Sequence, residues 1–130
     1  MSIFRSPQVI LFSADVPRAV AFYTGLGFAE TFRVPVDAEP IHVDLALDGY
    51  KIGIASVAST RDDHGLSPIA EGQRAAVILW TDDTTRAYED LVARGAPALA
   101  APYEWLGRLL IAWTSDPDGN PIQIVQSLAG

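Results

Sequence analysis

The stretch "DPDGNPIQIVQ", residues 116–126, decides the fold because it joins a turn to a strand and occurs twice in the chain. Asp-Pro and Asp-Gly pairs are typical of turns, and the two isoleucines that follow alternate with other residues as in a strand. A weaker copy, "DGYKIGIAS", covers residues 48–56. The residue between the isoleucines is Gln123 in one copy and Gly53 in the other.

The repetition extends over most of the chain. Residues 9–28, "VILFSADVPRAVAFYTGLGF", align with residues 77–96, "VILWTDDTTRAYEDLVARGA", at an offset of 68. The turn and strand align at an offset of 70, which requires a two-residue insertion. A repeat of this length indicates two copies of one supersecondary unit.

Each copy predicts a strand, a helix and three more strands. In the first copy, "QVILFSA" alternates as a strand, Asp15 is a helix N-cap, and residues 16–27 carry apolar side chains at helical spacing. The strands "FAETFRVPV", "IHVDLALDG" and "YKIGIASV" follow. The second copy reads "AAVILWT", a helix over 84–95, then "PALAAPY", "GRLLIAWTS" and "NPIQIVQS".

The predicted class is α+β, with two βαβββ modules in one domain of residues 1–130. Module one covers 8–56, a polar linker with Gly and Pro covers 57–73, and module two covers 74–127. A four-stranded sheet with one covering helix leaves its other face open. Two such sheets are expected to share their open faces as a cleft.

Strand alternation predicts which side chains line this cleft. The set beneath the helices is Val9, Leu11, Val43, Leu45, Leu47, Ile52, Ile54, Val77, Leu79, Ile122 and Ile124. The cleft-facing set is Gln8, Ile10, Phe12, His42, Asp44, Ala46, Gly53, Ala76, Ile78, Trp80 and Gln123. Trp113 is assigned to packing on the opposite alternation.

The amino-acid composition limits the classes of function that the chain can have. About half of the 130 residues are apolar, enough for one core, and the absence of cysteine excludes disulfides, thiolate metal ligands and a cysteine nucleophile. The net charge of −7 and nine scattered basic residues predict no nucleic-acid partner. An acidic chain attracts cationic small molecules, although acidity also simply maintains solubility.

The chain is expected to be a soluble cytoplasmic protein without a membrane partner. Its first residues, "MSIFRSPQVILFSADV", lack the basic start, long apolar run and cleavage site of a signal peptide. No apolar stretch approaches the roughly 20 residues that cross a bilayer.

These features resemble the vicinal oxygen chelate superfamily, which includes glyoxalase I, extradiol dioxygenases, and fosfomycin- and bleomycin-resistance proteins. The resemblance rests on the paired βαβββ units, on "DVPRAVAFYTGLGF" and on "DPDGNPIQIV", and it covers nearly the whole chain. It is specific for the fold and says less about activity.

The resemblance also implies where a metal would lie. Family enzymes hold one divalent ion on the open sheet faces, with ligands that fall here on Gln8, Gly53, Ala76 and Gln123. Glycine and alanine side chains have no donor atom, and two neutral amides are poor ligands for a divalent ion. We therefore expect no metal and no other cofactor at these positions.

Aromatic side chains then dominate the predicted cleft. Phe12 and Trp80 hold equivalent positions in the two modules, and Trp105 is expected near the cleft's lip. A single aromatic residue is more readily explained by the core, whereas the symmetric pair on the open face favours a ligand surface. The stretch from Trp105 to Arg108, "WLGR", resembles a turn of the bleomycin-resistance proteins. That branch implies a metal-free homodimer that sequesters a cationic, aromatic antibiotic in grooves between subunits. The sequence does not decide whether the cleft forms within one chain or across a dimer, or whether the linker covers it.

Two functions from different classes remain. The first is a binding protein that sequesters an aromatic or cationic natural product; its expected contacts are Gln8, Ile10, Phe12, His42, Asp44, Ile78, Trp80, Trp105, Arg108 and Gln123. The alternative is a lyase or isomerase that uses His42 and Asp44, or a metal bound in an unexpected way. His42 and Asp44 lie two apart on one strand face, which also suits a plain solvated pair. His64, in "TRDDHG", is expected at the solvated surface.

Overall fold

Two units make up the chain in this computed structural model: unit one, Met1–Glu71, and unit two, Gly72–Gly130. The structure describes residue 3, residues 6–69 and residues 75–128. Predicted module two begins at residue 74, which lies outside the described residues.

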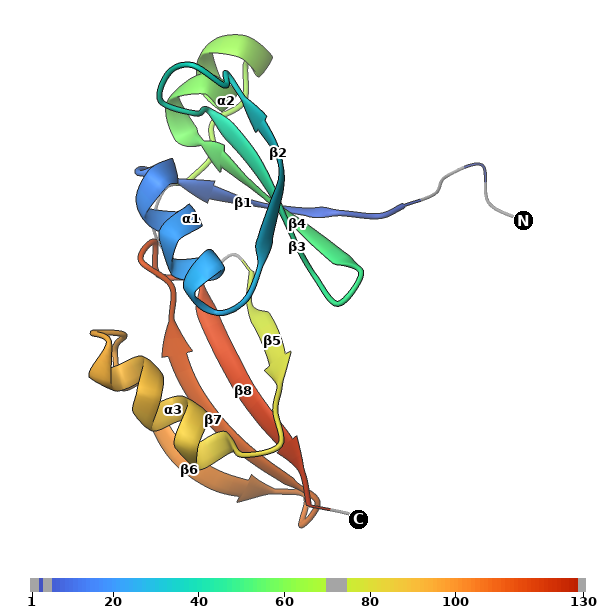
Figure 1. The fold of residues 1–130 in the computed structure, drawn as a ribbon, viewed down its shortest axis with the longest axis vertical. Helices are drawn as coiled ribbons and strands as arrows, with labels where there is room; N and C mark the ends of the chain where they lie inside the picture. Colours follow the sequence, from blue (N-terminus) through green and yellow to red (C-terminus); the bar gives the residue numbers. More distant parts are fainter. Residues whose placement is uncertain (1–2, 4–5, 70–74, 129–130) are drawn as a thin grey trace. The chain divides into compact units, whose positions relative to one another are not determined.

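In its described residues, unit one contains one four-stranded sheet, which we call sheet one, and two helices. The elements of this unit are β1 (Val9–Ser13), α1 (Val16–Gly25), β2 (Ala29–Val34), β3 (His42–Leu47), β4 (Tyr50–Ser56) and α2 (Val57–His64). The strand order is β1-β4-β3-β2, in which β1 runs parallel to β4 and the other neighbours are antiparallel. The first and last strands of the module are therefore neighbours (Figure 1).

Unit two repeats this topology in sheet two. Its elements are β5 (Val77–Trp80), α3 (Thr84–Ala93), β6 (Ala100–Trp105), β7 (Leu109–Ser115) and β8 (Pro121–Ser127). The order β5-β8-β7-β6, with β5 parallel to β8, matches sheet one strand for strand. The two copies in the sequence are thus two βαβββ modules, as the repeat predicts.

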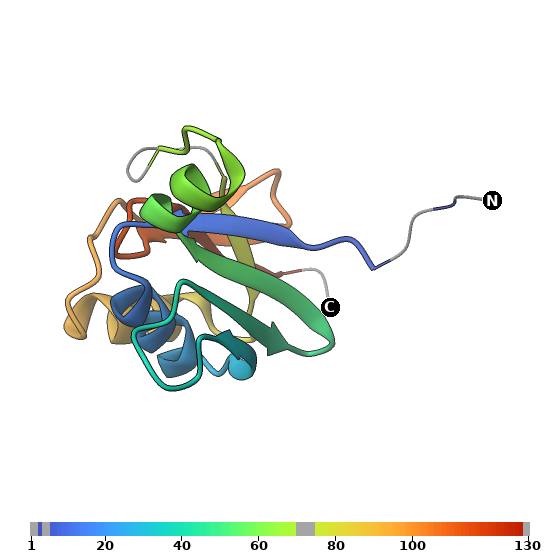
Figure 2. The ribbon, with the colours of Figure 1, turned by 90° about the horizontal axis from the view of Figure 1, so that it is seen from above.

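Each module has one long helix on one side of its sheet, and the two helices begin in the same way. The Asp15 side chain accepts a hydrogen bond from the Arg18 amide at 3.1 Å, and the Asp83 side chain accepts one from the Arg86 amide at 3.0 Å. Both are N-caps that satisfy a free amide of the first turn. Helix α1 packs on β3 and β4, and α3 packs on β6, β7 and β8 (Figures 1 and 2).

The core of each unit lies between its helix and its sheet. Helix α1 buries its predicted apolar stripe, and the helix-facing strand residues predicted from alternation are mostly buried. These are Val16, Ala19, Val20 and Tyr23 on α1, with Leu11, Val43, Leu45, Ile54, Ile122 and Ile124 on the strands. Val9 differs, because it is 57% exposed although its register partner Ile52 faces the helix side.

A helix that the sequence analysis does not predict occupies the first half of the linker. Ser56 caps α2 by accepting a hydrogen bond from the Ser59 amide at 3.0 Å, and Gly65 ends it at a positive φ of 69°. The helix is polar on nearly all sides, so no apolar period reveals it in the sequence. Among the described residues, no helix has the length and apolar character needed to cross a membrane.

The turn that begins the stretch 116–126 is stabilised by one buried carboxylate, that of Asp116. Asp116, 3% exposed, accepts hydrogen bonds from the backbone amides of Asp118 and Asn120 at 2.9 and 2.8 Å, and from the Asn120 side chain at 2.8 Å. Asp118 and Asn120 are themselves buried. This carboxylate therefore fixes the entry into β8.

Replacing this carboxylate tests its contribution to the fold. In Asp116→Ala, two buried backbone amides lose their acceptor, so the free energy of unfolding should fall by about 2–4 kcal/mol. Urea denaturation followed by circular dichroism measures the change. The exposed Asp63 serves as the control, since Asp63→Ala should change the value by less than about 0.5 kcal/mol. Equal stabilities of the two variants would contradict this role.

Candidate binding surfaces on the open sheet faces

The open face of sheet one, its side away from α1, carries two rows of side chains set by strand pairing. In the first row, Ile10, Gly53, Asp44 and Phe32 follow one another across the four strands. The second row is Phe12, Ala55, His42 and Val34. Residues paired across a ladder point to the same face. A polar centre thus lies between apolar side chains, and Phe32, which is 51% exposed, was not among the predicted contacts.

The polar centre is a hydrogen-bonded cluster of three side chains, called the Gln8–His42–Asp44 cluster below. The Gln8 amide Nε2 donates to Asp44 Oδ1 at 2.7 Å, and His42 Nε2 lies 2.8 Å from the same oxygen. Both His42 and Asp44 are half-buried. Within the described residues Asp44 forms no ion pair with a lysine or arginine. Arg33, on the neighbouring strand β2, pairs instead with Glu30, and its hydrogen bond lowers the pKa of the Glu30 carboxyl.

Gly53 forms the floor of this cluster. A Cβ added to this buried glycine would lie 3.1 Å from Gln8 Nε2, 3.2 Å from His42 Cε1 and 3.3 Å from Asp44 Oδ1. Such contacts are tight, so the three side chains occupy the space that a side chain at position 53 would need. Glycine at position 53 therefore leaves the space that the three side chains of the cluster occupy.

The ligand positions that the family resemblance implies do not supply the imidazole and carboxylate donors that a divalent metal ion favours. Gly53 and Ala76 provide no donor, and the Gln8 amide is bonded to Asp44. Gln8, His42 and Asp44 offer one amide, one imidazole and one carboxylate, but these groups bond to one another. In residue 3 and residues 6–69 and 75–128, no three His, Asp or Glu side chains gather in a way that could hold a metal ion. The expected absence of a metal stays a prediction.

The open face of sheet two, its side away from α3, carries all three tryptophans of the chain. Trp80 pairs with Val125, Trp113 pairs with Gln123, and Trp105 pairs with Leu109. Alternation along β7 and β8 places these pairs on one side. The opposite side belongs to α3, because the Thr84 amide at its start donates to the side chain of Gln126 at 2.9 Å. Trp80 and Trp105 are 67% and 51% exposed.

The assignment of Trp113 to packing on the opposite alternation is wrong. Trp113 stands directly across from Gln123, on the open face, and its neighbours Ala112 and Thr114 are the buried, helix-facing residues. Its indole Nε1 donates to the Tyr103 hydroxyl at 3.0 Å. Tyr103, another residue absent from the predicted contacts, thereby joins the tryptophans. We call Trp80, Tyr103, Trp105 and Trp113 the aromatic face.

The "WLGR" stretch forms the tight turn between β6 and β7. Leu106 and Gly107 both have positive φ, 56° and 65°, and the Arg108 amide donates to the Trp105 carbonyl at 3.2 Å. The side chains of Leu106 and Arg108 are exposed. Two consecutive residues at positive φ are the geometry of a hairpin turn that matches strand twist. The turn thus places Trp105 at the end of the aromatic face.

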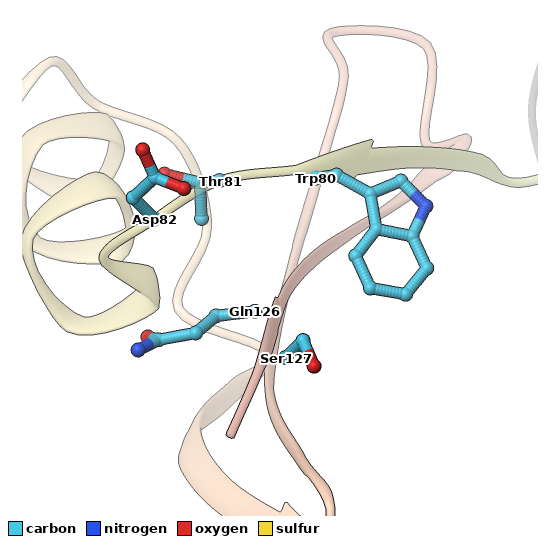
Figure 3. A pocket seen from close by; sticks show the side chains of 5 residues that line it. All are labelled: Trp80, Thr81, Asp82, Gln126 and Ser127. Carbon is cyan, nitrogen blue, oxygen red and sulfur yellow. The ribbon is translucent and has the colours of Figure 1, made fainter. Parts of the chain in front are cut away.

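A pocket of about 600 Å³ opens at the ends of β5 and β8. Trp80, Thr81, Asp82, Gln126 and Ser127 line it. Figure 3 shows Trp80 and Ser127 on one side of the pocket and the side chains of Asp82 and Gln126 on the other. Trp80 and Asp82 therefore line the same hollow from opposite sides, and this pairing of an aromatic with an acidic residue suits an aromatic ligand with a positive charge.

The predicted contacts fall into two groups of five. The group in unit one is Gln8, Ile10, Phe12, His42 and Asp44. In this group, Gln8 and His42 both contact the Oδ1 oxygen of Asp44. The group in unit two is Ile78, Trp80, Trp105, Arg108 and Gln123. His64, at the end of α2, is exposed as predicted. Asp82 was missed because a lone acidic residue after a strand carries no distinctive pattern.

Comparisons with known proteins extend these observations. A structure described as a glyoxalase/bleomycin resistance protein/dioxygenase from Nocardioides is 23% identical; the match covers 100% of this chain and 87% of that one, with a TM-score of 0.79. TioX from Micromonospora sp. ML1 is 21% identical over 96% and 100% of the two chains, with a TM-score of 0.76. Lactoylglutathione lyase from Agrobacterium tumefaciens is 16% identical over 92% and 90%, with a TM-score of 0.72.

These structural likenesses show the fold. Among curated proteins, no sequence matches the chain. The profile of the Glyoxalase/Bleomycin resistance protein/Dioxygenase superfamily, in contrast, matches residues 5–124, which is nearly the whole sequence. The paired βαβββ modules agree with that match. The chain therefore belongs to the glyoxalase/bleomycin resistance protein/dioxygenase superfamily, also known as the vicinal oxygen chelate superfamily.

Proposed function

We propose that this chain is a metal-free, cytoplasmic binding protein that sequesters an aromatic, cationic small molecule such as an antibiotic. The observation that carries the proposal is the aromatic face, because all three tryptophans and Tyr103 point to one side of sheet two. Tryptophan side chains that remain half or more exposed present large apolar surfaces to a ligand. Each stacked ring contributes about 0.5–1.5 kcal/mol beyond the area that it buries.

Charge favours a cationic ligand. The chain carries a net charge of −7, and the exposed Asp82 borders the pocket on the side opposite Trp80. A cation over an indole ring gains about 0.5–2 kcal/mol, and a nearby carboxylate adds to the attraction. The superfamily resemblance supports the same class, since its bleomycin-resistance members bind a cationic antibiotic with an aromatic tail.

The alternative function, a lyase or isomerase, rests on a different part of the molecule, namely His42 and Asp44 in unit one. A His42→Ala change separates the two functions. Binding at the aromatic face should survive this change, whereas acid–base turnover should not.

The aromatic face can be tested with a pair of planar probes of different charge. Isothermal titration calorimetry should show that the cation 9-aminoacridine binds more tightly than the neutral acridone. Trp80→Ala should weaken 9-aminoacridine binding about tenfold, because about 1.4 kcal/mol of stacking and cation–π energy is lost. Tyr50→Ala, which removes an exposed aromatic ring in unit one, is the matched control.

The same titration separates charge from stacking. Asp82→Asn should weaken binding of 9-aminoacridine a few-fold and leave acridone unchanged, with Asp63→Asn as the control. The loss should shrink at high salt, since exposed charges are screened. Unchanged affinity of Trp80→Ala for both probes would contradict the proposed surface.

Native mass spectrometry tests the proposed homodimer and the proposed absence of metal together. The expected spectrum of gently purified protein shows twice the chain mass, 14.0 kDa each, without a stoichiometric metal ion. Two neutral amides at the implied ligand positions provide the reason for the second expectation. One divalent ion per chain would contradict the metal-free proposal, and a monomer mass at micromolar concentration would contradict the dimer.

A further inference from the structure

The Gln8–His42–Asp44 cluster contains one ring nitrogen, Nδ1 of His42, that is available to accept a proton. An ionised carboxylate can only accept hydrogen bonds, so His42 Nε2, 2.8 Å from Asp44 Oδ1, carries the hydrogen. The other ring nitrogen, Nδ1, is then the one with a free electron pair. Nδ1 has no hydrogen-bond partner among the described residues, and no buried side-chain nitrogen or oxygen there lacks one. Solvent, or a ligand, therefore reaches Nδ1.

Asp44 is itself held in place by a residue outside its own strand. Gln8, which precedes β1, donates to the same Oδ1 at 2.7 Å, while His42 and Asp44 both lie on β3. Gln8 thus fixes the carboxylate that the imidazole contacts. A carboxylate in this position also stabilises the imidazolium that forms when the ring takes up a proton.

The surroundings of the cluster suit an uncharged, apolar substrate. The ring of Phe32 stands edge-on to that of His42, with 6.2 Å between the centroids, and Phe12 and Val34 lie in the same row of the open face. Below the cluster, Gly53 leaves room that a side chain would fill. The Asp44 carboxylate, without a lysine or arginine partner in the described part of the chain, would repel an anion.

We propose that His42 is the base of a metal-independent proton-transfer site that acts on an uncharged carbonyl compound with an acidic neighbouring C–H group. The C–H bond breaks, its proton moves to His42 Nδ1, and its electron pair passes to the carbonyl oxygen as an enolate. The imidazolium then returns a proton either to the enolate oxygen, which gives the enol isomer, or to the same carbon, which regenerates the substrate with its hydrogen exchanged for one from solvent. No oxidant, reductant or metal is consumed. Asp44 acts as a positioning residue.

The experiment measures exchange of the C1 protons of 2-tetralone for deuterium in D₂O by proton NMR. This neutral, aromatic ketone is the probe because its enolate forms at an activated CH₂ group. The wild-type protein should exchange these protons about a hundredfold faster than His42→Gln, the typical contribution of a positioned base. The glutamine can still donate to Asp44, so the fold should persist, and equal melting temperatures verify this.

Two further measurements keep the proposal falsifiable. Gly53→Ala adds a Cβ without requiring a positive φ, so it should displace the cluster and slow exchange about tenfold while the protein stays folded. Nitrogen-15 NMR of His42 should show hydrogen on Nε2 in the wild type and a mixture of tautomers in Asp44→Asn.

The proposal is overturned by any of three results. These are wild-type exchange within twofold of His42→Gln, hydrogen on Nδ1 in the wild type, or exchange that EDTA abolishes and Zn²⁺ restores. Asp63→Ala, a change of an exposed residue outside both surfaces, should leave the exchange unchanged. Exchange of 2-tetralone reports on His42 alone and titration with 9-aminoacridine reports on the aromatic face, so failure of one proposal is distinguishable from failure of the other.

Discussion

The parallel pairing of the first and last strands within each module determines where the side chains of both surfaces lie. In unit one β1 pairs with β4, which sets Ile10 beside Gly53, and in unit two β5 pairs with β8, which sets Ile78 beside Gln123. Because side chains alternate along a strand, a shift of one residue would turn the whole open face inward. The buried carboxylate of Asp116 maintains the start of β8 and so supports this register.

Equivalent positions of the two modules have diverged into different chemistry. The position across from Gly53 holds Asp44, and the position across from Gln123 holds Trp113. His42 in unit one likewise corresponds to Ile111 in unit two, by the same pairing. One open face is therefore polar at its centre, whereas the other is aromatic. The difference between glycine and glutamine follows from these neighbours, since a polar cluster fills the space above Gly53.

Much of the fold follows from local patterns in the sequence. The paired turns, the N-caps Asp15 and Asp83 and the apolar stripe of α1 each depend on residues close together in the chain, so they are predictable. The contact between Gln8 and Asp44 spans 36 positions, and only their common face could be inferred. Trp113 was misplaced because "LLIAW" is apolar at every position, which hides the alternation. Helix α2 was missed because a polar helix has no apolar period.

The most direct test of the aromatic face uses the indole N–H signals of the three tryptophans in a ¹H–¹⁵N spectrum during titration with 9-aminoacridine. Since Trp80, Trp105 and Trp113 lie on one face, their signals should shift together and saturate at a single concentration. Binding elsewhere would give saturating shifts of backbone amides while all three indole signals stay fixed. That result would contradict the assignment of ligand binding to sheet two.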